Sequence, residues 1–524
     1  MTTGRHQDRL RMRPTNTRHC CLWLFLLPAC GADLAEPGLV TEFGDPSANV
    51  PGAPPPPHDA LPETPAGMNA PSGSSAANAE GQVPIGGVAP PLMPSAPGSP
   101  GGAAGSAGES DPQLPVTPPA NGELVAFPGA QGFGRLAVGA RGRDVVHVTN
   151  LNDSGPGSLR DAISQPQRTV VFDVGGVIQL ESRLVFKSNQ TIAGQTAPGG
   201  GITLYGDGTS FSGVSNTIVR YIRFRMGRAG ESEKDTVTMA NGHDVIWDHC
   251  SLSWGRDGTF DLNVESGEEL YNLTLQDSIV SQGLQTHSTG GLVQTSGTSI
   301  LRTLYIDNNS RNPKARGTLQ FVNNVVYNWV VSGYILGDTA GRSDGYMVGN
   351  YFIPGPETRG GTLDSPTPEY QLFASGNFYD SDKDGVLDGR LLGQGDFGSV
   401  TWHEAPSVPF PEVPALAADA ALRFVSEHAG ASLYRDAVDD YVLAELASFG
   451  TRGATIDDEA SLGLPDVVGT LPSATAPADL DRDGMADAWE QQNGLNPGNA
   501  EDRNGDRNGD GWTNLEEYVN SLVP

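Results

Sequence analysis

Two segments near the C-terminus carry acidic residues at a spacing that suits calcium. In DLDRDGMADAWE (479–490) and DRNGDGWTNLEE (506–517), oxygen-bearing side chains occupy positions 1, 3, 5, 9 and 12, and glycine occupies position 6. This is the spacing of a twelve-residue calcium loop, in which the glycine permits a sharp turn. A disordered acidic tail is the alternative. The predicted ligands are Asp479, Asp481, Asp483, Asp487 and Glu490 in the first loop, and Asp506, Asn508, Asp510, Asn514 and Glu517 in the second.

A third acidic stretch, DSDKDGVLDG, lies at 380–389. It carries Asp380, Asp382, Asp384 and Asp388, but its twelfth position is Leu391 instead of a bidentate acid. Because this closing ligand is missing, we predict a solvated turn and not a metal site.

More acids stand in the middle of the chain. Glu233 and Asp235 are two residues apart in EKDTVTM, so on a strand they would share one face. Asp257 and Asp261 follow in RDGTFDLN. All four are hard oxygen donors, which suit Ca²⁺ better than zinc or copper. The segment therefore predicts a second, separate metal site.

Three cations follow in RNPKARG. Arg311 and Arg316 are five residues apart, and Lys314 lies between them. Fixed positive charges of this kind stabilise negative charge that develops during a reaction. The acids and the cations together supply the parts of a site that handles an anionic substrate.

The region from 123 to 470 predicts a scaffold of short strands for these groups. Bursts such as TVVFDVGG and NTIVRYIRFR are bounded by Gly, Asn, Asp or Ser. Short polar residues recur at 248, 277, 308, 324, 350 and 377. Such loose periods indicate a stacked solenoid, whereas a β-sandwich, the alternative, places a turn every 8–12 residues or so. SLRDAIS at 158–164 predicts a short helix that caps the open end of the core.

Four segments together resemble the pectate lyases of polysaccharide lyase family 1. They are FPGAQGFGR (127–135), VTNLNDSGPGSLRDAI (148–163), IWDHCSLSW (246–254) and SRNPKARG (310–317). The resemblance covers about residues 123–465. It implies an all-β fold, the right-handed parallel β-helix, and calcium-dependent β-elimination of polygalacturonate.

The resemblance also implies roles for single residues. Asp235, Asp257 and Asp261 would hold calcium, with Glu233 beside them. Arg311 would be the catalytic base and Arg316 the partner of the substrate carboxylate. Eliminating a uronate removes the C5 proton next to a carboxylate, so the doubly anionic carbanion needs metal ions or guanidinium groups. Because arginine normally stays protonated, Arg311 needs a strongly perturbed site, or it stabilises the charge while hydroxide takes the proton.

One segment departs from the family pattern. HSTG at 287–290 stands where a substrate-binding lysine is usual, and Thr289 carries no charge. His287 is the expected replacement in its charged form, or the contact is missing. Lys314 is a further substrate-binding candidate. We interpret His249, in the Asp-His pair of IWDHCSLSW, as a structural histidine.

The amino-acid composition disfavours some classes of binding partner. The 62 acidic and 32 basic residues give a net charge of −30, which disfavours nucleic acid because phosphate contacts need clustered Lys and Arg. Cys250 is the one cysteine outside the first thirty residues, so the body of the protein has no intramolecular disulfide. We expect a monomer that binds pectate.

The N-terminal part predicts export. In residues 1–30, five arginines precede the apolar run CCLWLFLLPA, which is typical of a signal peptide. Its end resembles a bacterial lipobox, so Cys30 is the predicted lipid anchor, with plain secretion as the alternative. Residues 31–122 hold 20 of the 40 prolines and no Lys or Arg, which predicts a disordered linker. The predicted location is secreted, or the surface or outer membrane of a bacterium.

The parts combine into one functional hypothesis. A β-helix at 123–470 and paired calcium loops at 478–524 would form an extracellular pectate lyase that releases 4,5-unsaturated oligogalacturonides. Its C-terminal loops resemble EF-hand and dockerin-like repeats. The alternatives are a non-catalytic β-helix that binds acidic glycans, and a lyase or hydrolase acting on another acidic polysaccharide.

Overall fold

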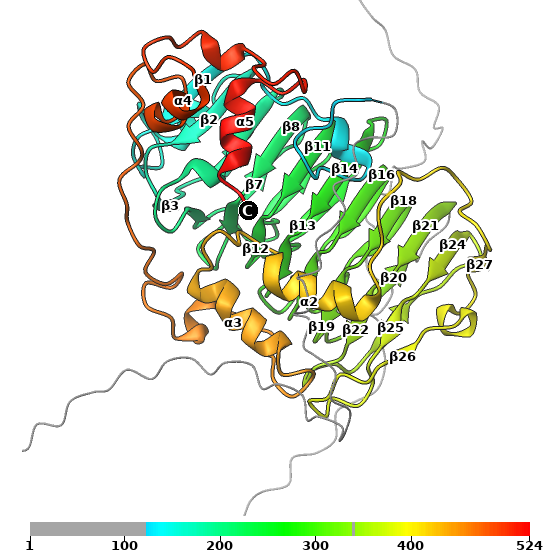
Figure 1. The fold of residues 1–524 in the computed structure, drawn as a ribbon. Helices are drawn as coiled ribbons and strands as arrows, with labels where there is room; N and C mark the ends of the chain where they lie inside the picture. The colour runs from blue at the N-terminus through cyan, green and yellow to red at the C-terminus, as the bar shows by residue number, and fades with distance from the viewer. Residues whose placement is uncertain (1–121, 338–340) are drawn as a thin grey trace, which may run out of the picture. The chain divides into compact units, whose positions relative to one another are not determined.

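Parallel strands stack into a solenoid in the computed structural model, which describes residues 122–337 and 341–524 (Figure 1). The predicted export signal, Cys30 and nearly all of the predicted linker lie outside the described residues. The described chain falls within one compact unit, Ala104–Pro524. The prediction of an all-β, right-handed parallel β-helix is confirmed.

The strands form two sheets. The larger, seventeen-stranded sheet contains β1 (Asp144–Val148), β2 (Arg168–Phe172), β4 (Leu184–Val185), β5 (Gln190–Ala193), β7 (Thr209–Ser210), β8 (Val214–Arg220), β10 (Val237–Met239), β11 (Gly242–Asp248), β13 (Phe260–Asn263), β14 (Leu270–Gln276), β16 (Leu292–Leu301), β18 (Lys314–Val322), β20 (Ser332–Leu336), β21 (Ser343–Val348), β23 (Gly361–Asp364), β24 (Tyr370–Ser375) and β27 (Thr401–Trp402). The ten-stranded sheet contains β3 (Gly176–Gln179), β6 (Ile202–Tyr205), β9 (Ile222–Arg225), β12 (Ser251–Ser253), β15 (Ile279–Ser281), β17 (Leu304–Ile306), β19 (Val325–Tyr327), β22 (Tyr351–Ile353), β25 (Phe378–Tyr379) and β26 (Arg390–Leu391).

The register shows why the sequence period is loose. Asp248 of β11 pairs with Gln276 of β14, which pairs with Leu301 of β16. Leu301 pairs with Val322 of β18, and Val322 with Val348 of β21. Each turn therefore has its own length, because the loops between the strands differ.

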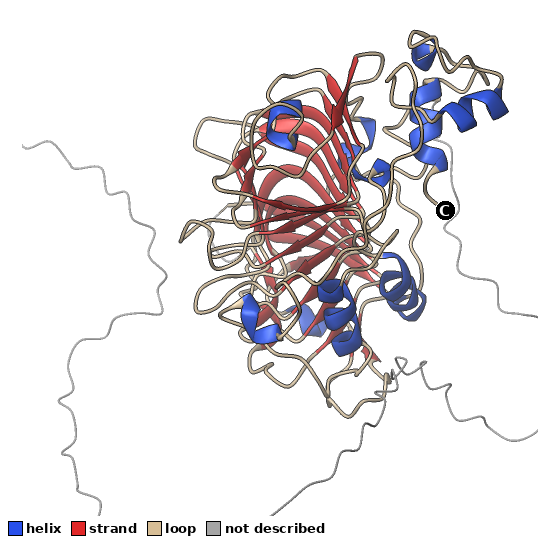
Figure 2. Cartoon of the chain, turned by 90° about the vertical axis from the view of Figure 1, so that its left-hand side faces the viewer, coloured by secondary structure: helices blue, strands red, loops and turns tan. Residues whose placement is uncertain are grey.

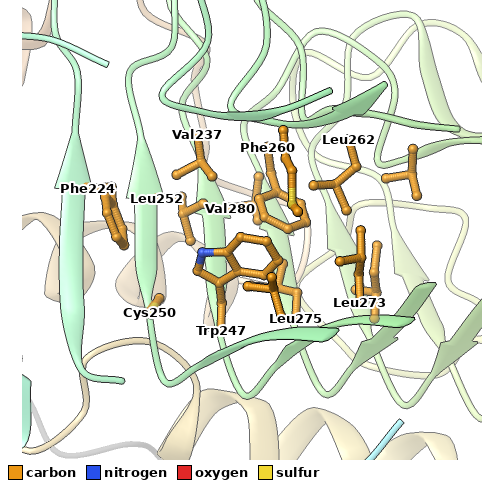
Figure 3. Packing of buried hydrophobic residues seen from close by; sticks show 14 of the residues in the cluster. Phe224, Val237, Trp247, Cys250, Leu252, Phe260, Leu262, Leu273, Leu275 and Val280 are labelled. Carbon is orange, nitrogen blue, oxygen red and sulfur yellow. The ribbon is translucent and has the colours of Figure 1, made fainter. Parts of the chain in front are cut away.

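The interior is filled by apolar side chains from both sheets (Figure 3). Trp247 of β11 is fully buried and makes edge-to-face contacts with Phe211 and Phe260 at 5.2 and 5.3 Å between ring centroids. The Cys250 thiol is buried beside them, and burial raises its pKa to about 12. These layers hold the strands at fixed spacing, since close-packed cores resist displacement.

Five of the six recurring polar residues divide into two kinds. Asn324, Asn350 and Asn377 stack as a buried ladder, in which each amide nitrogen donates to the next oxygen at 3.1 and 2.8 Å. Asp248 and Asp277 instead form buried ion pairs with arginines at 2.7 and 2.6 Å. Both kinds satisfy polar groups at the bends between strands, where backbone pairing is interrupted.

Helices cover parts of the solenoid (Figure 2). The predicted cap is confirmed as α1 (Leu159–Ala162), whose Ser158 hydroxyl accepts from the Asp161 amide. Sequence reasoning missed α2 (Ala418–His428) and α3 (Ala437–Leu446), which cover an apolar strip of the ten-stranded sheet. Short 3-10 helices complete the elements: η1 (Phe133–Leu136), η2 (Gly194–Thr196), η3 (Gln394–Phe397), η4 (Glu459–Leu462) and η5 (Asp502–Asn504).

The C-terminal loops lie against the first strands of the solenoid. Their helices are α4 (Asp487–Asn493) and α5 (Asn514–Ser521). Tyr518 and Val519 share a buried cluster with Val171 of β2. Glu516 forms an ion pair with Arg141 at 2.8 Å. In the part of the chain that the structure describes, no helix is long and apolar enough to cross a membrane.

Candidate functional site

The central acids gather at the start of two neighbouring strands of the larger sheet. Asp235 lies just before β10, and Asp257 lies in the bend before β13. Asp261 is on β13, where it pairs with Thr238 of β10. Glu233 corrects the sequence prediction, because it occupies an exposed turn with φ of 59° and not a strand face shared with Asp235.

The carboxylates of Asp235 and Asp261 converge over Gly258. The Gly258 amide donates to Asp235 Oδ1 at 2.9 Å, and the Leu292 amide donates to Asp261 Oδ1 at 2.8 Å. A Cβ at Gly258 would lie 2.2 Å from Asp261 Oδ1 and 3.1 Å from Asp235 Oδ1. Glycine therefore leaves the space between the two carboxylates open.

The acids perturb one another. Burial, and then the charge of Asp257, raise the pKa of Asp235 to about 6. Burial and the charge of Asp235 raise the pKa of Asp261 well above its usual range, and Arg311 opposes this shift. Mutual repulsion of this kind is what a bound divalent cation relieves.

The donor set fits a calcium ion in its chemistry, because hard carboxylate oxygens face a space that glycine leaves open. The three carboxylates are nevertheless less compact than those of the C-terminal loops. Among the described residues, they are not one of the groups whose ligand atoms all lie within 4.8 Å of one another. Asp257 has another partner, since its Oδ1 lies 2.9 Å from His287 Nε2.

His287 and Thr289 both contact Asp257. The His287 side chain is 64% exposed and faces the Asp257 carboxylate. Thr289 is buried, and its backbone amide donates to the Asp257 carbonyl at 3.0 Å. The backbone of Thr289 thus joins two turns of the solenoid, and the substrate-binding role of His287 stays a prediction.

The three cations lie on the next turns of the same sheet. Arg311 precedes β18, and its carbonyl accepts from the Gly291 amide at 2.7 Å. Arg311 has φ of 55°, a left-handed conformation that it shares with other residues of this chain, such as His249 and Asp277. On β18, Lys314 and Arg316 are half-buried and flank the buried Ala315, so they share the outer face.

Register connects the cations to the acids. Leu262 of β13 pairs with Val293 of β16, and Leu292 of β16 pairs with Lys314 of β18. Asp261, one residue before Leu262, is therefore level with Lys314 across the intervening strand. The fold brings together Asp235, Asp257, Asp261, His287, Arg311 and Lys314, and it places Arg316 further along β18.

Sequence reasoning missed Arg183. This residue precedes β4, and its Nη2 donates to the Asp235 backbone carbonyl at 3.4 Å. Its charge lowers the pKa of Asp235. Only the pairing of β4 with β7, and of β7 with β10, connects the two positions, and no local pattern signals it.

The C-terminal loops are compact acidic clusters. In the first, ligand oxygens of Asp479, Asp481 and Asp483 lie within 4.8 Å of one another, and those of Asp483, Glu490 and Asp502 do likewise. Both oxygens of Glu490 are buried without a hydrogen-bond partner in the described chain. Burial and neighbouring acids raise the pKa of Asp483 and of Glu490 to about 7.

Two predicted ligands have another role in these loops. The ninth-position side chains, Asp487 and Asn514, accept from the second-position amides of Leu480 and Arg507 at 2.8 and 3.1 Å. They close the backbone of each loop, and Asp487 is not a member of the first loop's acidic clusters. The missed member is Asp502, which lies between the two twelve-residue segments.

The second loop has the same arrangement with a smaller cluster. Ligand oxygens of Asp506, Asp510 and Glu517 lie within 4.8 Å of one another. Asn508 donates to Asp510 at 2.9 Å. Both loops therefore present oxygen donors to a central space, which suits calcium.

This chain is similar to several curated proteins, although no family model matches it. A probable pectate lyase C of Aspergillus flavus is 49% identical over 409 residues, which cover 76% of this chain and 94% of that protein. A probable pectate lyase C of Emericella nidulans is also 49% identical, covering 76% and 93%. A solved thermostable pectate lyase is 14% identical with a TM-score of 0.44, covering 60% of this chain and 100% of that one.

Proposed function

This chain belongs to the pectate lyases, a family of polysaccharide lyases. We propose that it cleaves polygalacturonate by calcium-dependent β-elimination, at the site where β10, β13 and β18 begin. The observation that carries the proposal is the meeting of acids and cations over Gly258. Asp235 and Asp261 converge there, and the charge of Arg311 acts on Asp261. A uronate polymer needs both kinds of group, since its carboxylates must be bound and its carbanion stabilised.

The acids hold the metal in this proposal. Asp235, Asp257 and Asp261 are the ligands, and backbone amides fix the first and last of them. When bound, calcium withdraws electron density from the substrate carboxylate and so acidifies the C5 proton. Asp257 has to exchange its contact with His287 for the ion.

The cations bind and stabilise the substrate anion. Lys314, level with Asp261, and Arg316 on the same face are positioned to pair with uronate carboxylates along the strand. Arg311 stands at the eliminated residue. Its side chain either accepts the C5 proton as the neutral guanidine, or stays a guanidinium that neutralises the enolate while hydroxide takes the proton. The C4–O bond then breaks and a conjugated double bond forms in the 4,5-unsaturated product.

The test follows the product's chromophore. Polygalacturonate with calcium should give ultraviolet absorbance from the conjugated double bond, and chelation should abolish the increase. New reducing ends without absorbance would indicate hydrolysis and overturn the elimination. No cleavage of polygalacturonate, together with cleavage of another acidic polysaccharide, would overturn the substrate.

We also propose that the two C-terminal loops bind calcium independently of the reaction. The support is the buried, unpartnered oxygens of Glu490 and the compact clusters around them. Two ions would neutralise part of the net charge of −8 on residues 478–524, which carry eleven acids and three arginines. Charge density of that size opposes compaction when it is uncompensated.

Export is a proposal that depends on the sequence of residues 1–30 alone. A cultured host should release the chain, or hold it at the cell surface through Cys30 if that residue is lipidated. Cys30→Ser would then move activity from the membrane fraction to the medium. Activity in the medium for both forms would exclude the anchor and leave plain secretion.

A further inference from the structure

The loop at 380–389 closes the end of the ten-stranded sheet. It leaves β25 and returns as β26, which pairs with β25 in antiparallel orientation. The Asp380 amide donates to the Phe352 carbonyl at 3.0 Å, and the Gly389 amide donates to the Tyr351 hydroxyl at 3.1 Å. Both ends of the loop are therefore fixed to the preceding turn of the solenoid.

Three aspartates of this loop face one another. One carboxylate oxygen from each of Asp380, Asp382 and Asp388 lies within 4.8 Å of the other two. Asp380 is only 2% exposed, so the prediction of a solvated turn is wrong for this residue. Neither of its carboxylate oxygens has a hydrogen-bond partner in the described chain. Burial and the charges of Asp382 and Asp388 raise the pKa of Asp380, and the nearby Asp382 amide offsets only part of this rise.

The loop's own cations are directed elsewhere. Lys383 Nζ donates to the Thr358 carbonyl at 2.9 Å. Arg390 forms an ion pair with Asp396 at 2.7 Å. Asp384, the fourth acid, uses its Oδ1 to accept from the Val386 amide at 2.8 Å. The loop's cations therefore leave the charge of the three clustered aspartates uncompensated, and burying an unpaired carboxylate opposes folding.

We propose that Asp380, Asp382 and Asp388 bind a calcium ion that fastens the last turn of the solenoid. All three are hard oxygen donors, and a divalent ion would satisfy the unpartnered oxygens of Asp380. Water and backbone carbonyls complete the coordination, since Leu391 supplies no twelfth-position carboxylate. This ion is distinct from those proposed for Asp235, Asp257 and Asp261 and for the C-terminal loops, and its role is structural.

The test counts ions on the full chain. After chelation and dialysis against calcium, Asp380→Asn should hold one calcium ion fewer per chain than the wild type. Melting temperatures should cross: without calcium the Asn variant melts higher, because it lacks a repelling buried charge, and with calcium the wild type melts higher. Activity on polygalacturonate at saturating calcium should be unchanged.

Asp384→Asn is the matched control. It removes the same charge from the same loop, keeps the acceptor for Val386, and should retain the ion. Asp388→Asn, at the exposed member of the cluster, should lose the ion as Asp380→Asn does, and it serves if the buried variant folds poorly. Equal ion counts in wild type and Asp380→Asn would overturn the site and indicate a protonated Asp380. Equal ion loss in Asp384→Asn would overturn the placement, since general loop charge would then hold the ion.

Discussion

The central acids, Asp235, Asp257 and Asp261, and the first C-terminal loop both gather carboxylates, but the oxygens have different neighbours. Among the central acids, Asp235 and Asp261 accept from backbone amides, and Asp257 pairs with His287. In the loop, both oxygens of Glu490 and of Asp481 lack hydrogen-bond partners in the described chain. The protein's own hydrogen bonds therefore hold the central acids, whereas the charges of the loop acids have no such compensation. In the proposed reaction, the central acids share their ion with a substrate carboxylate.

The largest effect should come from Arg311, the arginine beside the central acids. Arg311→Ala should lower kcat at least about 100-fold, because a fixed charge at the reacting group is worth that much or more. The melting temperature should stay near that of the wild type, since Arg311 is only half-buried. Arg359→Ala, at an exposed position outside the candidate site, is the control. Loss of folding in Arg311→Ala, or retention of kcat, would contradict its assignment to chemistry.

The second prediction is that the first C-terminal loop affects the stability of the protein but not the calcium requirement of the reaction. Glu490→Gln should remove about 1–3 kcal/mol of the free energy of unfolding in calcium, because a charged ligand to the ion is lost. The calcium concentration that half-saturates activity should not change. Glu501→Gln, at an exposed acid between the loops, is the control. A point substitution is preferable to removal of residues 478–524, because that removal would also expose the buried Val171 of the solenoid.

The same variant also tests whether the calcium requirement of the reaction arises from the C-terminal loops instead of the central acids. Calorimetric melting and lyase rates should be recorded on the same Glu490→Gln samples across a calcium titration. If the calcium requirement of the reaction shifts together with the melting temperature, the metal acts through the C-terminal loops. The assignment of Asp235, Asp257 and Asp261 to the catalytic ion would then be wrong.

A smaller effect is expected at His287. Exposed ion pairs contribute roughly 0.2–1 kcal/mol, so His287→Ala should lower the calcium concentration needed for half-maximal rate by a factor of about 1.5–5. The reason is that Asp257 loses a competing partner. The readout is the rate against free calcium at fixed substrate. A rise in KM for polygalacturonate without a change in the calcium requirement would instead assign His287 to substrate binding.

The smallest effect concerns two further acids, Asp307 and Glu445, which are buried away from solvent. Asp307 is fully buried and accepts from Asn328 at 2.6 Å. Burial and the neighbouring Glu445 raise the pKa of Asp307 well above its usual range, and burial raises the pKa of Glu445. Each acid keeps one oxygen without a partner, which a proton shared between the two would satisfy.

The sign of the pH effect follows from these raised pKa values. A raised pKa in the folded state gives stability that is complete below the unfolded value, about pH 4, and is lost as pH rises through the folded value. Asp307→Asn should flatten this decline, because the amide needs no proton. Melting temperatures measured from about pH 4 upward should diverge in favour of the variant. Parallel curves would show that the pair does not titrate in this range.

The sequence alone determined the features that depend on residues close together along the chain. The Ser158 cap, the strand bursts and the members of the second loop, Asp506 and Glu517, were all found by local spacing. Capping and loop closure act over three to twelve residues or so, so a linear pattern contains them. The sequence also indicated Asp235, Asp257, Asp261 and Arg311 together, through their resemblance to a known family.

Tertiary structure decided the contacts that cross turns. Asp502 joins a loop to which it does not belong in sequence, and Arg183 reaches Asp235 from more than fifty residues away. The tertiary structure also showed that Asp380 is buried and that Glu233 lies on a turn. The physical reason is that each solenoid turn has its own length, so the partners of a residue follow from strand pairing and core packing and cannot be counted along the chain.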